Sequence, residues 1–506
     1  MRARGKSGEE LVKVCIQSVR QIIMQASARP YLLAALTLYW LWVNVTVQSP
    51  LFFPEIVILK KTSFPSWFGP VIVGGISYFA IGVKFREASS FARRSKYGIA
   101  ISSLMTGGAV LCLIWIYIFD AGVFSLGAFV TYFFGSVGIG VGTACLLVEW
   151  GRVFGLLGPR EVIYQGIVAM LLSAVALAVL AVVPDSAGRI VLASIPVPLM
   201  CCFVRATKHL PKQAMYDQGL EVDARIPWKF LITAFLHGLA LGVLLGGFAS
   251  IEGCNGTLIS ALSFIIAALL LLLTSVFAKM DFNHLIYQIG FPIMASGAVA
   301  IACMRSFSLV GESIQLVGFC YVHLIMWGLC SYLTKRFSLS AAWVVAWPTC
   351  CLMLGQFIGG VAGGLVTQHD SSGDQVAIAA TLVSFILLFA ALCMMSNRNL
   401  TTGWGIAVPA NAIENSQPVD FLGQTIRAIA VEAGLTPRET DTLLFFARGY
   451  NRRSISEELT VSEETVKSHI NGIYRKMDIH SQQELLAVVK EREESLKFSS
   501  SESCLE

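Results

Sequence analysis

Charged residues are scarce in this chain. Only 14% of its 506 residues are charged and 55% are hydrophobic, with a mean hydropathy of +0.69, whereas about a quarter of the residues in average soluble proteins are charged. The composition excludes a wholly soluble protein. From about Tyr31 to Asn397 apolar runs follow one another, each of roughly 17–25 residues and long enough to cross a bilayer as a helix. No such run follows Leu400.

The motifs of metal sites and enzymes are also missing. Most of the thirteen cysteines fall inside apolar runs, where cysteine behaves as a small hydrophobe. No C-x-x-C pair occurs, and the adjacent pairs at 201–202 and 350–351 lack further ligands at metal-binding spacing. No phosphate-binding G-x-x-x-x-G-K-[ST] loop and no serine or cysteine nucleophile motif is present. We therefore predict no metal, no cofactor and no enzymatic activity.

The amino-terminal segment does not have the pattern of a cleaved signal peptide. Between Leu11 and Ala28 the apolar pattern is interrupted by Lys13 and Arg20, which is typical of an amphipathic helix lying on the membrane surface. We expect residues 1–30 to form a cytoplasmic amphipathic segment and residues 31–396 to form the transmembrane domain.

Twelve apolar segments can be placed in the transmembrane domain. They cover about 31–49, 67–84, 97–119, 122–148, 162–183, 188–204, 228–250, 258–278, 287–304, 314–334, 341–366 and 376–396. Because the number is even, both ends of the chain are expected on the same side of the membrane.

The loop charges decide which side that is. The loops on one side hold fifteen Lys and Arg residues, and those on the other side hold four. The richer set is Lys84, Arg86, Arg93, Arg94, Lys96, Arg152, Arg160, Arg205, Lys208, Lys212, Arg225, Lys229, Lys279, Lys335 and Arg336; the poorer set is Lys60, Lys61, Arg189 and Arg305. Positive loops stay in the cytoplasm, which also accounts for the net charge of +5. We predict a multi-pass protein of the inner membrane with both termini cytoplasmic.

Ionisable residues within the predicted spans are few. Glu55 falls in an outer loop, and Asp120, Glu149, Arg305 and Glu312 fall at segment ends. His237 and His323 are then the titratable residues near mid-span, and each is more often a hydrogen-bonded packing residue than a ligand. Coupled transport commonly uses ionisable groups inside the bilayer, so their scarcity favours a sensor over a transporter.

A small-molecule site could be built from polar and aromatic residues near mid-span. Binding sites are mostly apolar with a few polar anchors, although Trp and Tyr also collect at membrane interfaces. Tyr321 and Trp343 lie at comparable depth. The candidate ligand-binding set is Asn44, Tyr132, His237, His323, Trp327 and Gln356.

The longest predicted cytoplasmic loop, about Arg205 to Pro227, divides the spans into six and six. In this respect the region resembles the major facilitator superfamily. The resemblance implies an all-α bundle of twelve helices in two halves. Glycine-rich stretches at 135–142 and 355–364 fit close helix packing.

The cytoplasmic tail begins with a linker. From Asn397 to about Pro418 the residues are mainly Asn, Thr, Gly, Pro and Ser, which bury too little apolar surface to fold alone. A short helix from Asp420 to Ala433 completes a linker at 397–434. A domain of four helices is expected over 435–494, followed by a disordered tail at 495–506.

Start signals mark the helices of this domain. Thr436, Pro437 and Glu439 form a capping box with proline at the first helical position. The second helix is expected at about Ser454 to Leu459, and a four-residue turn from Thr460 leads to the third. Ser462 is the expected N-cap of the third helix, Glu463 to Met477. Ser481 and Glu484 open the fourth.

The third helix carries the functional prediction. Val466, Ile470, Ile473 and Met477 recur at helical spacing and are expected to face the core. The opposite stripe is Glu464, Lys467, Ser468, Asn471 and Arg475. Such side chains can reach base edges in a major groove, and His469 and Lys476 flank the stripe on the side expected to face phosphates. A short helix, a tight turn and an exposed second helix form a helix-turn-helix.

The tail is similar to the DNA-binding domain of LuxR-type transcription regulators. The matching stretches are Leu435-Thr-Pro-Arg-Glu439, Ala447-Arg-Gly-Tyr450, Ile455-Ser-Glu-Glu-Leu459, Val461-Ser-Glu-Glu-Thr-Val-Lys-Ser-His-Ile470 and Ile473-Tyr-Arg-Lys-Met477. The resemblance implies base contacts from Lys467, Ser468 and Asn471. It implies phosphate contacts from Thr465, His469, Lys476 and the loop Asn451 to Arg453, which includes Arg452. It also implies a homodimer on DNA, with Leu485 and Val489 at the dimer contact.

Two alternatives remain open at this point. The tail carries nine Lys and Arg against eleven Asp and Glu between 435 and 494, so a packing module competes with DNA binding, although the charges are segregated. The membrane region is expected either to sense a small molecule of unknown identity or to transport one. We favour a membrane-bound transcription regulator with DNA, membrane lipid and a small molecule as partners; a facilitator-type transporter with a regulatory tail is the alternative.

Overall fold

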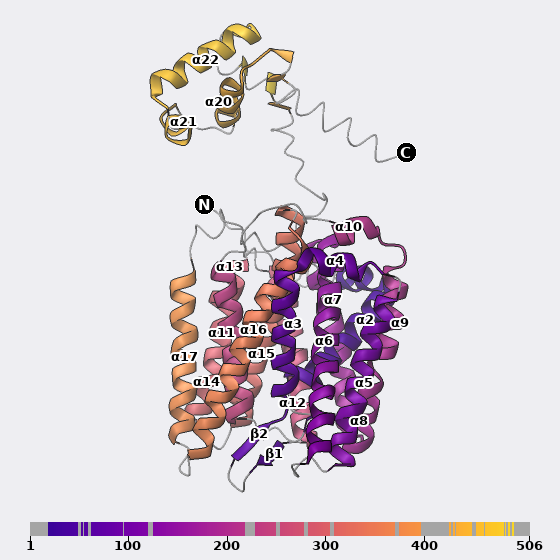
Figure 1. The fold of residues 1–506 in the computed structure, drawn as a ribbon. Coiled ribbons are helices and arrows are strands. Elements are labelled where there is room, and N and C mark those ends of the chain that lie inside the picture. The colour runs from indigo at the N-terminus through magenta and orange to yellow at the C-terminus, as the bar shows by residue number, and fades with distance from the viewer. Residues whose placement is uncertain are drawn as a thin grey trace. The chain divides into compact units, whose positions relative to one another are not determined.

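The computed structural model describes most of the chain, in the ranges 19–48, 52–53, 55–58, 62–94, 96–119, 125–217, 228–248, 253–277, 282–303, 308–337, 339–369, 374–395, 425–426, 429–430, 432–447, 452–459, 461–479, 481, 484–485 and 488–489. The chain separates into two compact units, Met1–Ala412 and Ile413–Glu506 (Figure 1). Each unit is described by itself.

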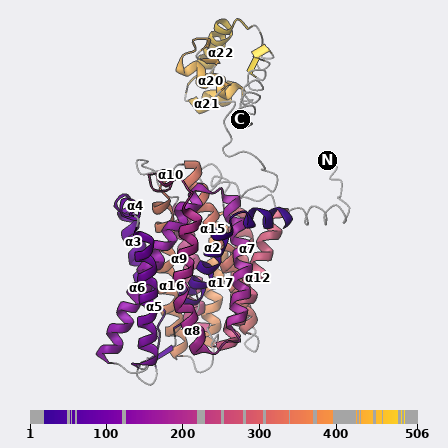
Figure 2. The same cartoon turned by 90° about the vertical axis from the view of Figure 1, so that its right-hand side faces the viewer.

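The first unit is a bundle of long helices that run side by side (Figures 1 and 2). Its amino-terminal elements are α2 (Pro30–Val43), the π-helix η1 (Asn44–Gln48), α3 (Phe68–Val83), α4 (Phe85–Ala92), α5 (Tyr97–Tyr117), α6 (Leu126–Leu156), α7 (Pro159–Leu180), α8 (Asp185–Ser194) and α9 (Pro196–Thr207). A short antiparallel hairpin of β1 (Glu55–Ile58) and β2 (Thr62–Pro65) lies between η1 and α3, with Ile56 opposite Phe64.

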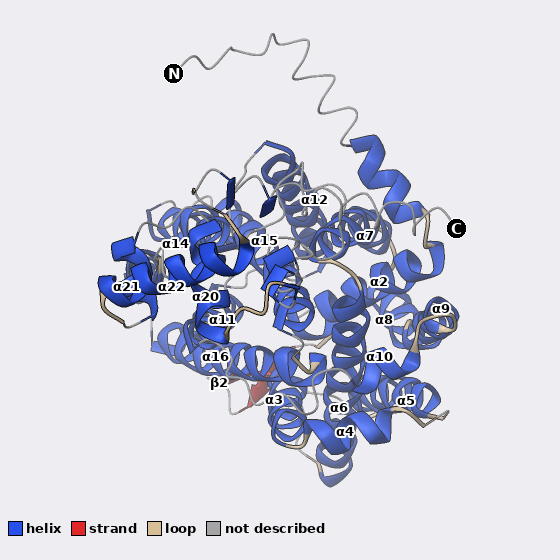
Figure 3. Cartoon of the chain, turned by 90° about the horizontal axis from the view of Figure 1, so that it is seen from above, coloured by secondary structure: helices blue, strands red, loops and turns tan. Residues whose placement is uncertain are grey.

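A short helix, α10 (Lys212–Asp217), lies in the loop that the sequence places between the two halves. The elements that follow are α11 (Trp228–Val243), η2 (Leu244–Phe248), α12 (Gly253–Phe277), α13 (Phe282–His284), η3 (Leu285–Gly290), α14 (Phe291–Cys303), α15 (Ser308–Phe337), α16 (Ala341–His369) and α17 (Asp374–Met394). In the view down the bundle, other helices surround α15 (Figure 3), and every residue from 315 to 331 is buried within the protein.

Within the described ranges, ten helices are long and apolar enough to cross a membrane, or eleven if α3 and α4, which bend by 99° at their junction, form one span. The prediction of twelve spans is therefore not confirmed. The segment predicted at 31–49 corresponds to α2 and η1 and is not among these helices. The protein is a multi-pass membrane protein.

Glycines allow the closest helix contacts in the bundle. A Cβ atom at Gly238 of α11 would collide with the carbonyl oxygen of Leu352 in α16, and one at Gly355 would collide with the carbonyl oxygen of Phe235. On the other side of the bundle, Gly108 of α5 packs against the backbone of α6 at Gly138. Because a side chain would separate these backbones, the two glycine-rich stretches have the packing role that the sequence indicates.

Glu149, expected at a segment end, and Arg152, expected in a cytoplasmic loop, lie inside a helix instead. The sequence pattern ended the fourth span at 148, but α6 continues to Leu156 and includes Glu149 and Arg152. Their side chains are buried and form an ion pair. Tyr216 donates to the second carboxylate oxygen of Glu149 at 3.0 Å, and Arg152 donates to Ser89 at 3.3 Å. The helix continues through both charges because each has partners.

Glu312 is likewise inside α15 and not at its end, since α15 begins at Ser308. Its side chain is buried. Of the other residues expected at segment ends, Asp120 and Arg305 lie outside the described residues.

Residues 19–27 form a helix at the amino-terminal edge of the first unit. Ile22 and Ala26 are buried, while the neighbouring Ile23 and Met24 are more than half exposed. Gln165 of α7 donates to the carbonyl oxygen of Ala26 at 3.4 Å. This helix has one buried face and one exposed apolar edge, as an amphipathic surface helix requires; the part of the prediction before residue 19 lies outside the described residues.

The second unit is a small helical domain with its own core. Its helices are α20 (Pro437–Ala447), α21 (Arg452–Leu459) and α22 (Glu463–Met477), and residues 484–485 and 488–489 are also helical. The core contains Ile426, Ile429, Leu443, Phe446, Ile455, Val466, Ile470, Ile473, Ile479, Leu485 and Val489. Residues 425–426 and 429–430 of the predicted linker helix are helical and join this core. The linker before residue 425 and the tail after residue 489 lie outside the described residues.

Candidate nucleic-acid interface

Helix α22 begins and ends at the residues that the sequence indicates. The hydroxyl of Ser462 accepts a hydrogen bond from the backbone amide of Thr465 at 3.1 Å, which is an N-cap. At the other end Asp478 adopts a left-handed conformation with φ of 54°, and its amide donates to the carbonyl of Tyr474. This local geometry stops the helix after Met477.

The two faces of α22 differ in the way that the sequence predicts. Val466, Ile470 and Ile473 are buried against α20 and α21, and Met477 is partly buried. On the opposite face every member of the predicted stripe is exposed, namely Glu464, Lys467, Ser468, Asn471 and Arg475. These five side chains, with Gly472, line a shallow polar surface on α22. We call Glu464, Lys467, Ser468, Asn471 and Arg475 the polar face.

The polar face offers hydrogen-bonding groups that are free to rearrange. Nζ of Lys467 lies 3.1 Å from Oε1 of Glu464, but the two side chains are 50% and 82% exposed. Exposed pairs of this kind contribute about 0–1 kcal/mol. Lys467 can therefore leave Glu464 for another acceptor at little cost.

Lys476 is held differently from the residues of the polar face. Its Nζ donates to Oε2 of Glu439 at 2.7 Å and to the carbonyl oxygen of Gly434 at 3.1 Å. The same carboxylate accepts from the amide and the hydroxyl of Thr436, at 2.7 and 2.8 Å. Glu439 thus completes the predicted capping box of α20 and also ties α20 to α22. Sequence reasoning found the capping box but missed the tie, because Lys476 lies 37 positions away.

The environment of Glu439 favours its ionised form. Burial raises the pKa of this carboxyl, but the hydrogen bonds from Lys476 and Thr436 and the positive charge of Lys476 outweigh burial and lower the pKa from 4.5 to about 2. A Cβ atom placed on Gly472 would lie only 2.5 Å from Oε1 of Glu439. Gly472 therefore provides the space that brings the carboxylate against α22.

The remaining residues of the predicted DNA contacts are distributed around the start of α22 and on α21. Thr465 is partly buried, and its hydroxyl lies 2.8 Å from that of Ser462 within the N-cap. His469 is partly buried and Arg452, at the start of α21, is exposed. The side chain of Arg453 and the whole of Asn451 lie outside the described residues.

The two residues predicted at the dimer contact face inward. Leu485 and Val489 are 1% and 4% exposed, because both side chains pack into the core of their own domain. Val488, which lies between them in sequence, is 40% exposed. At helical spacing the neighbour of a buried residue points elsewhere, and the sequence pattern alone did not separate the two faces of this last helix.

The candidate ligand-binding residues are brought together only in part. The rings of His237 and His323 stack with their centroids 5.8 Å apart, and Trp327 lies 5.5 Å from His323. Asn44 and Gln356 are fully buried on η1 and α16. Tyr132 lies elsewhere: its hydroxyl accepts from the amide of Gly69 at 3.0 Å and donates to the carbonyl of Ser66 at 2.8 Å. These two hydrogen bonds join α6 to the start of α3 and to Ser66 just before it.

The carboxyl-terminal unit matches a family of DNA-binding proteins. Residues 433–489 match the family described as "Bacterial regulatory proteins, luxR family". The matched range covers α20, α21 and α22 and the buried residues Leu485 and Val489. The chain therefore carries a LuxR-type helix-turn-helix domain, joined to a multi-pass membrane domain.

Three bacterial regulators illustrate the match. The response regulator protein TodT of Pseudomonas putida is 41% identical over 63 residues, which are 12% of this chain and 28% of TodT. The transcriptional regulatory protein DegU of Brevibacillus brevis is 44% identical over 46 residues, 9% of this chain and 20% of DegU. A nitrate/nitrite response regulator protein homolog of Haemophilus influenzae is 45% identical over 47 residues, 9% of this chain and 23% of that protein. The match thus spans less than a third of each relative.

Two solved structures of transport proteins align with most of the chain at TM-scores below 0.5. A bacterial homologue of the iron transporter ferroportin, in an outward-facing state, aligns with a TM-score of 0.49 at 12% identity, over 74% of this chain and 99% of that one. The fucose:proton symporter FucP of E. coli aligns with a TM-score of 0.46 at 14% identity, over 75% of this chain and all of that one. These likenesses concern the fold alone.

Proposed function

We propose that this protein is a membrane-bound transcription regulator that binds DNA through the polar face of α22 in response to a small molecule bound by the membrane unit. The observation that carries the proposal is the exposure of that whole face on a helix whose opposite face is buried. Lys467, Ser468, Asn471 and Arg475 are the side chains that would contact bases. The exposed Arg452, with Arg453, Thr465 and His469, would contact phosphates.

Lys476 has a second role in this proposal. Its ammonium group is held by Glu439, yet its side chain remains 28% exposed. It can present positive charge to a phosphate without leaving the ion pair, since an ammonium group has three donors. We therefore keep Lys476 among the phosphate contacts and add a structural role to it.

The orientation and the assembly belong to the same proposal. The excess of Lys and Arg in one set of loops supports cytoplasmic termini, which puts the DNA-binding domain in the compartment of the chromosome. An inner-membrane location follows, with membrane lipid around the bundle. One helix-turn-helix reads a short half-site, so a homodimer on a two-half operator is the expected bound state.

Sequencing the DNA that co-purifies with the full-length protein tests the regulator proposal. Enrichment of one two-half sequence supports it, and a change in that enrichment on adding a small molecule supports sensing. Lys467→Ala should weaken binding to the enriched sequence and relax its sequence preference, since each lost base contact costs about 1–3 kcal/mol. Unchanged binding by Lys467→Ala would remove this face from the interface.

A second experiment separates the sensor from a transporter. Purified protein is reconstituted into liposomes, with and without residues 400–506, and solute uptake is measured. Uptake that survives the deletion would support the transporter alternative. The sensor proposal expects no concentrative uptake by either form.

A further inference from the structure

An aromatic cluster at the centre of the membrane unit contains polar ring atoms without hydrogen-bond partners. The ring of His323 lies 5.6 Å from Trp40, 5.5 Å from Trp327 and 5.8 Å from His237. Within the described residues, Nε1 of Trp40, both nitrogens of His237 and Nδ1 of His323 have no partner. An unsatisfied buried polar group costs about 1–3 kcal/mol, so close packing alone does not account for this arrangement.

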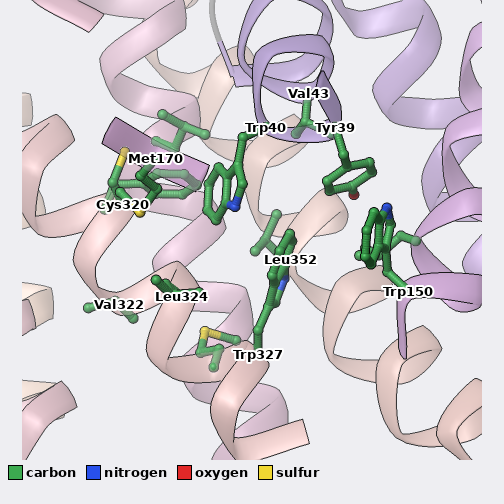
Figure 4. Packing of buried hydrophobic residues seen from close by; sticks show 14 of the residues in the cluster. Tyr39, Trp40, Val43, Trp150, Met170, Cys320, Val322, Leu324, Trp327 and Leu352 are labelled. Atoms are coloured by element: carbon green, nitrogen blue, oxygen red, sulfur yellow. The ribbon is translucent and has the colours of Figure 1, made fainter. Parts of the chain in front are cut away.

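A small cavity adjoins this cluster. Its volume is about 20 Å³, and its walls include His323 and Trp327 of α15, Phe154 of α6, Phe230 of α11 and Leu352 of α16. Figure 4 shows Trp40, Trp327 and Leu352 within the buried cluster, and the ring centroids of Trp40 and Trp327 lie 4.8 Å apart. A space of this size holds little more than one water molecule. It lies between a helix that precedes the long central loop and three helices that follow it.

One wall of the cavity is a helix with an interrupted hydrogen-bond ladder. Pro348 stands inside α16 and lines the cavity, and a proline cannot donate to the carbonyl four residues earlier, that of Val344. Sγ of Cys330 lies 3.8 Å from that oxygen and donates to it instead. A helix bends most readily at such a point. The cavity can therefore widen beside Pro348 without breaking a regular stretch of helix.

The chemistry of the walls restricts what the cavity can accept. The described lining residues include no Asp, Glu, Lys or Arg, so a charged ligand would lose its hydration without compensation. Aromatic rings of Phe154, Phe230 and Trp327 supply flat apolar surfaces. His323 also lines the cavity, and within the described residues Nδ1 of its imidazole has no hydrogen-bond partner.

We propose that this cavity opens to bind an uncharged planar aromatic molecule that carries one hydrogen-bonding group. The ligand ring packs on Trp327 and its polar group bonds to His323. This inference rests on the proposed function, for which it names the site and the class of ligand. A benzene-sized ligand needs a cavity of about 150 Å³, so binding requires α16 to bend at Pro348 and widen the cavity.

Indole is the probe for the test, because it is planar and uncharged and has one N–H group. Its binding to the full-length protein in lipid nanodiscs is measured by calorimetry, beside benzoate, which is charged, and cyclohexanol, which is not planar. Leu352→Trp fills the cavity. Leu354→Trp adds the same side chain two residues further along α16, where Leu354 is 52% exposed. His323→Phe keeps a ring and removes the polar atoms.

The expected result is saturable binding of indole that is at least tenfold tighter than that of benzoate or cyclohexanol. His323→Phe weakens it about tenfold, the equivalent of one hydrogen bond, and Leu352→Trp weakens it at least tenfold, while Leu354→Trp leaves it unchanged. If indole shows no saturable binding, the cavity holds only water and the inference is overturned. Equal binding of the three compounds also overturns it, as does indole binding that neither cavity variant changes.

Enrichment of an operator sequence is measured on the same preparations. If the protein enriches an operator sequence but does not bind indole, only the proposed ligand site is rejected. Loss of sequence-specific DNA binding rejects the regulator proposal, whatever indole does.

Discussion

The carboxylate of Glu439 and the ammonium group of Lys476 lie 2.7 Å apart, and their side chains are 10% and 28% exposed. The pair joins the first turn of α20 to the last turn of α22, so it fixes the helix that carries the polar face. Glu464 and Lys467 form a second pair at 3.1 Å, but on one exposed helix face. The same Glu→Gln substitution can therefore be compared in a largely buried ion pair, at Glu439, and in an exposed one, at Glu464.

Glu439→Gln should destabilise the carboxyl-terminal domain. Hydrogen bonds to a charged group contribute about 1.5–3 kcal/mol each, and the amide oxygen of glutamine, which carries no charge, accepts more weakly from Lys476 and Thr436 than the carboxylate does. Hydrogen exchange of the α20 and α22 amides in the full-length protein should show a loss of about 1–3 kcal/mol. Glu464→Gln is the control, with an expected change below about 0.5 kcal/mol. Equal changes in the two variants would contradict a special role for Glu439.

The contribution of Glu439 should depend on pH. Its pKa is lowered from 4.5 to about 2 in the folded protein, so the stability it supplies is complete above about pH 4.5 and is lost as the pH falls towards 2. The difference in amide protection between the native protein and Glu439→Gln, compared at equal pH, should narrow below pH 4.5. A difference that stays constant down to pH 3 would show that the carboxylate charge is not its source.

Lys476→Ala should lower the stability of the carboxyl-terminal domain, whereas Lys467→Ala should weaken DNA binding and leave the stability nearly unchanged. Lys476→Ala removes the main partner of a buried carboxylate, and an unpaired group of this kind costs about 1–3 kcal/mol. Lys467→Ala removes an exposed side chain and should change stability by less than about 0.5 kcal/mol, while weakening sequence-specific binding. Amide exchange and DNA titration on both variants check the distinction. A stable Lys476→Ala domain would assign Lys476 to DNA contact alone.

Gly472→Ala should destabilise the domain although alanine favours helix. Replacing a glycine within a helix ordinarily gains about 1 kcal/mol, but here the new Cβ would lie 2.5 Å from Oε1 of Glu439. The carboxylate must move, and its bonds to Lys476 and Thr436 weaken. In the double variant with Glu439→Gln the cost of Gly472→Ala should fall, since the ion pair is already absent. Additive effects of the two substitutions would argue against this coupling.

Ser331→Ala should loosen the contact between α6 and α15. The hydroxyl of Ser331 lies 2.7 Å from the carbonyl oxygen of Phe154 and 3.0 Å from that of Leu157, and it is buried. Its loss should lower the free energy of unfolding of the membrane unit, measured by thermal denaturation, by about 1 kcal/mol. Ser313→Ala on the same helix is the control, because its exposed hydroxyl donates to the carbonyl of Leu309 one turn away in the same helix. Equal effects would remove Ser331 from the contact between these helices.

Local sequence signals predicted the helix-turn-helix well. The N-cap Ser462, the bounds of α22 and the division into buried and exposed faces all depend on residues within one or two turns of each other, so spacing alone determines them. The buried faces of Leu485 and Val489 were not predicted, because a short amphipathic helix can turn its apolar side either to its own core or to a partner. The span count also differed, since α3 has only 16 residues and bends by 99° into α4, and hydropathy does not mark such a bend.

The sequence by itself determined that the chain is a membrane protein with a LuxR-type domain, because apolar runs and helical periodicity record which solvent each face meets. Only the tertiary structure decided that Glu439 holds Lys476 against α22. Only the tertiary structure likewise decided that Trp40, His237, His323 and Trp327 form one cluster beside a cavity. These contacts join residues far apart in the chain, and their geometry is set by how whole helices pack.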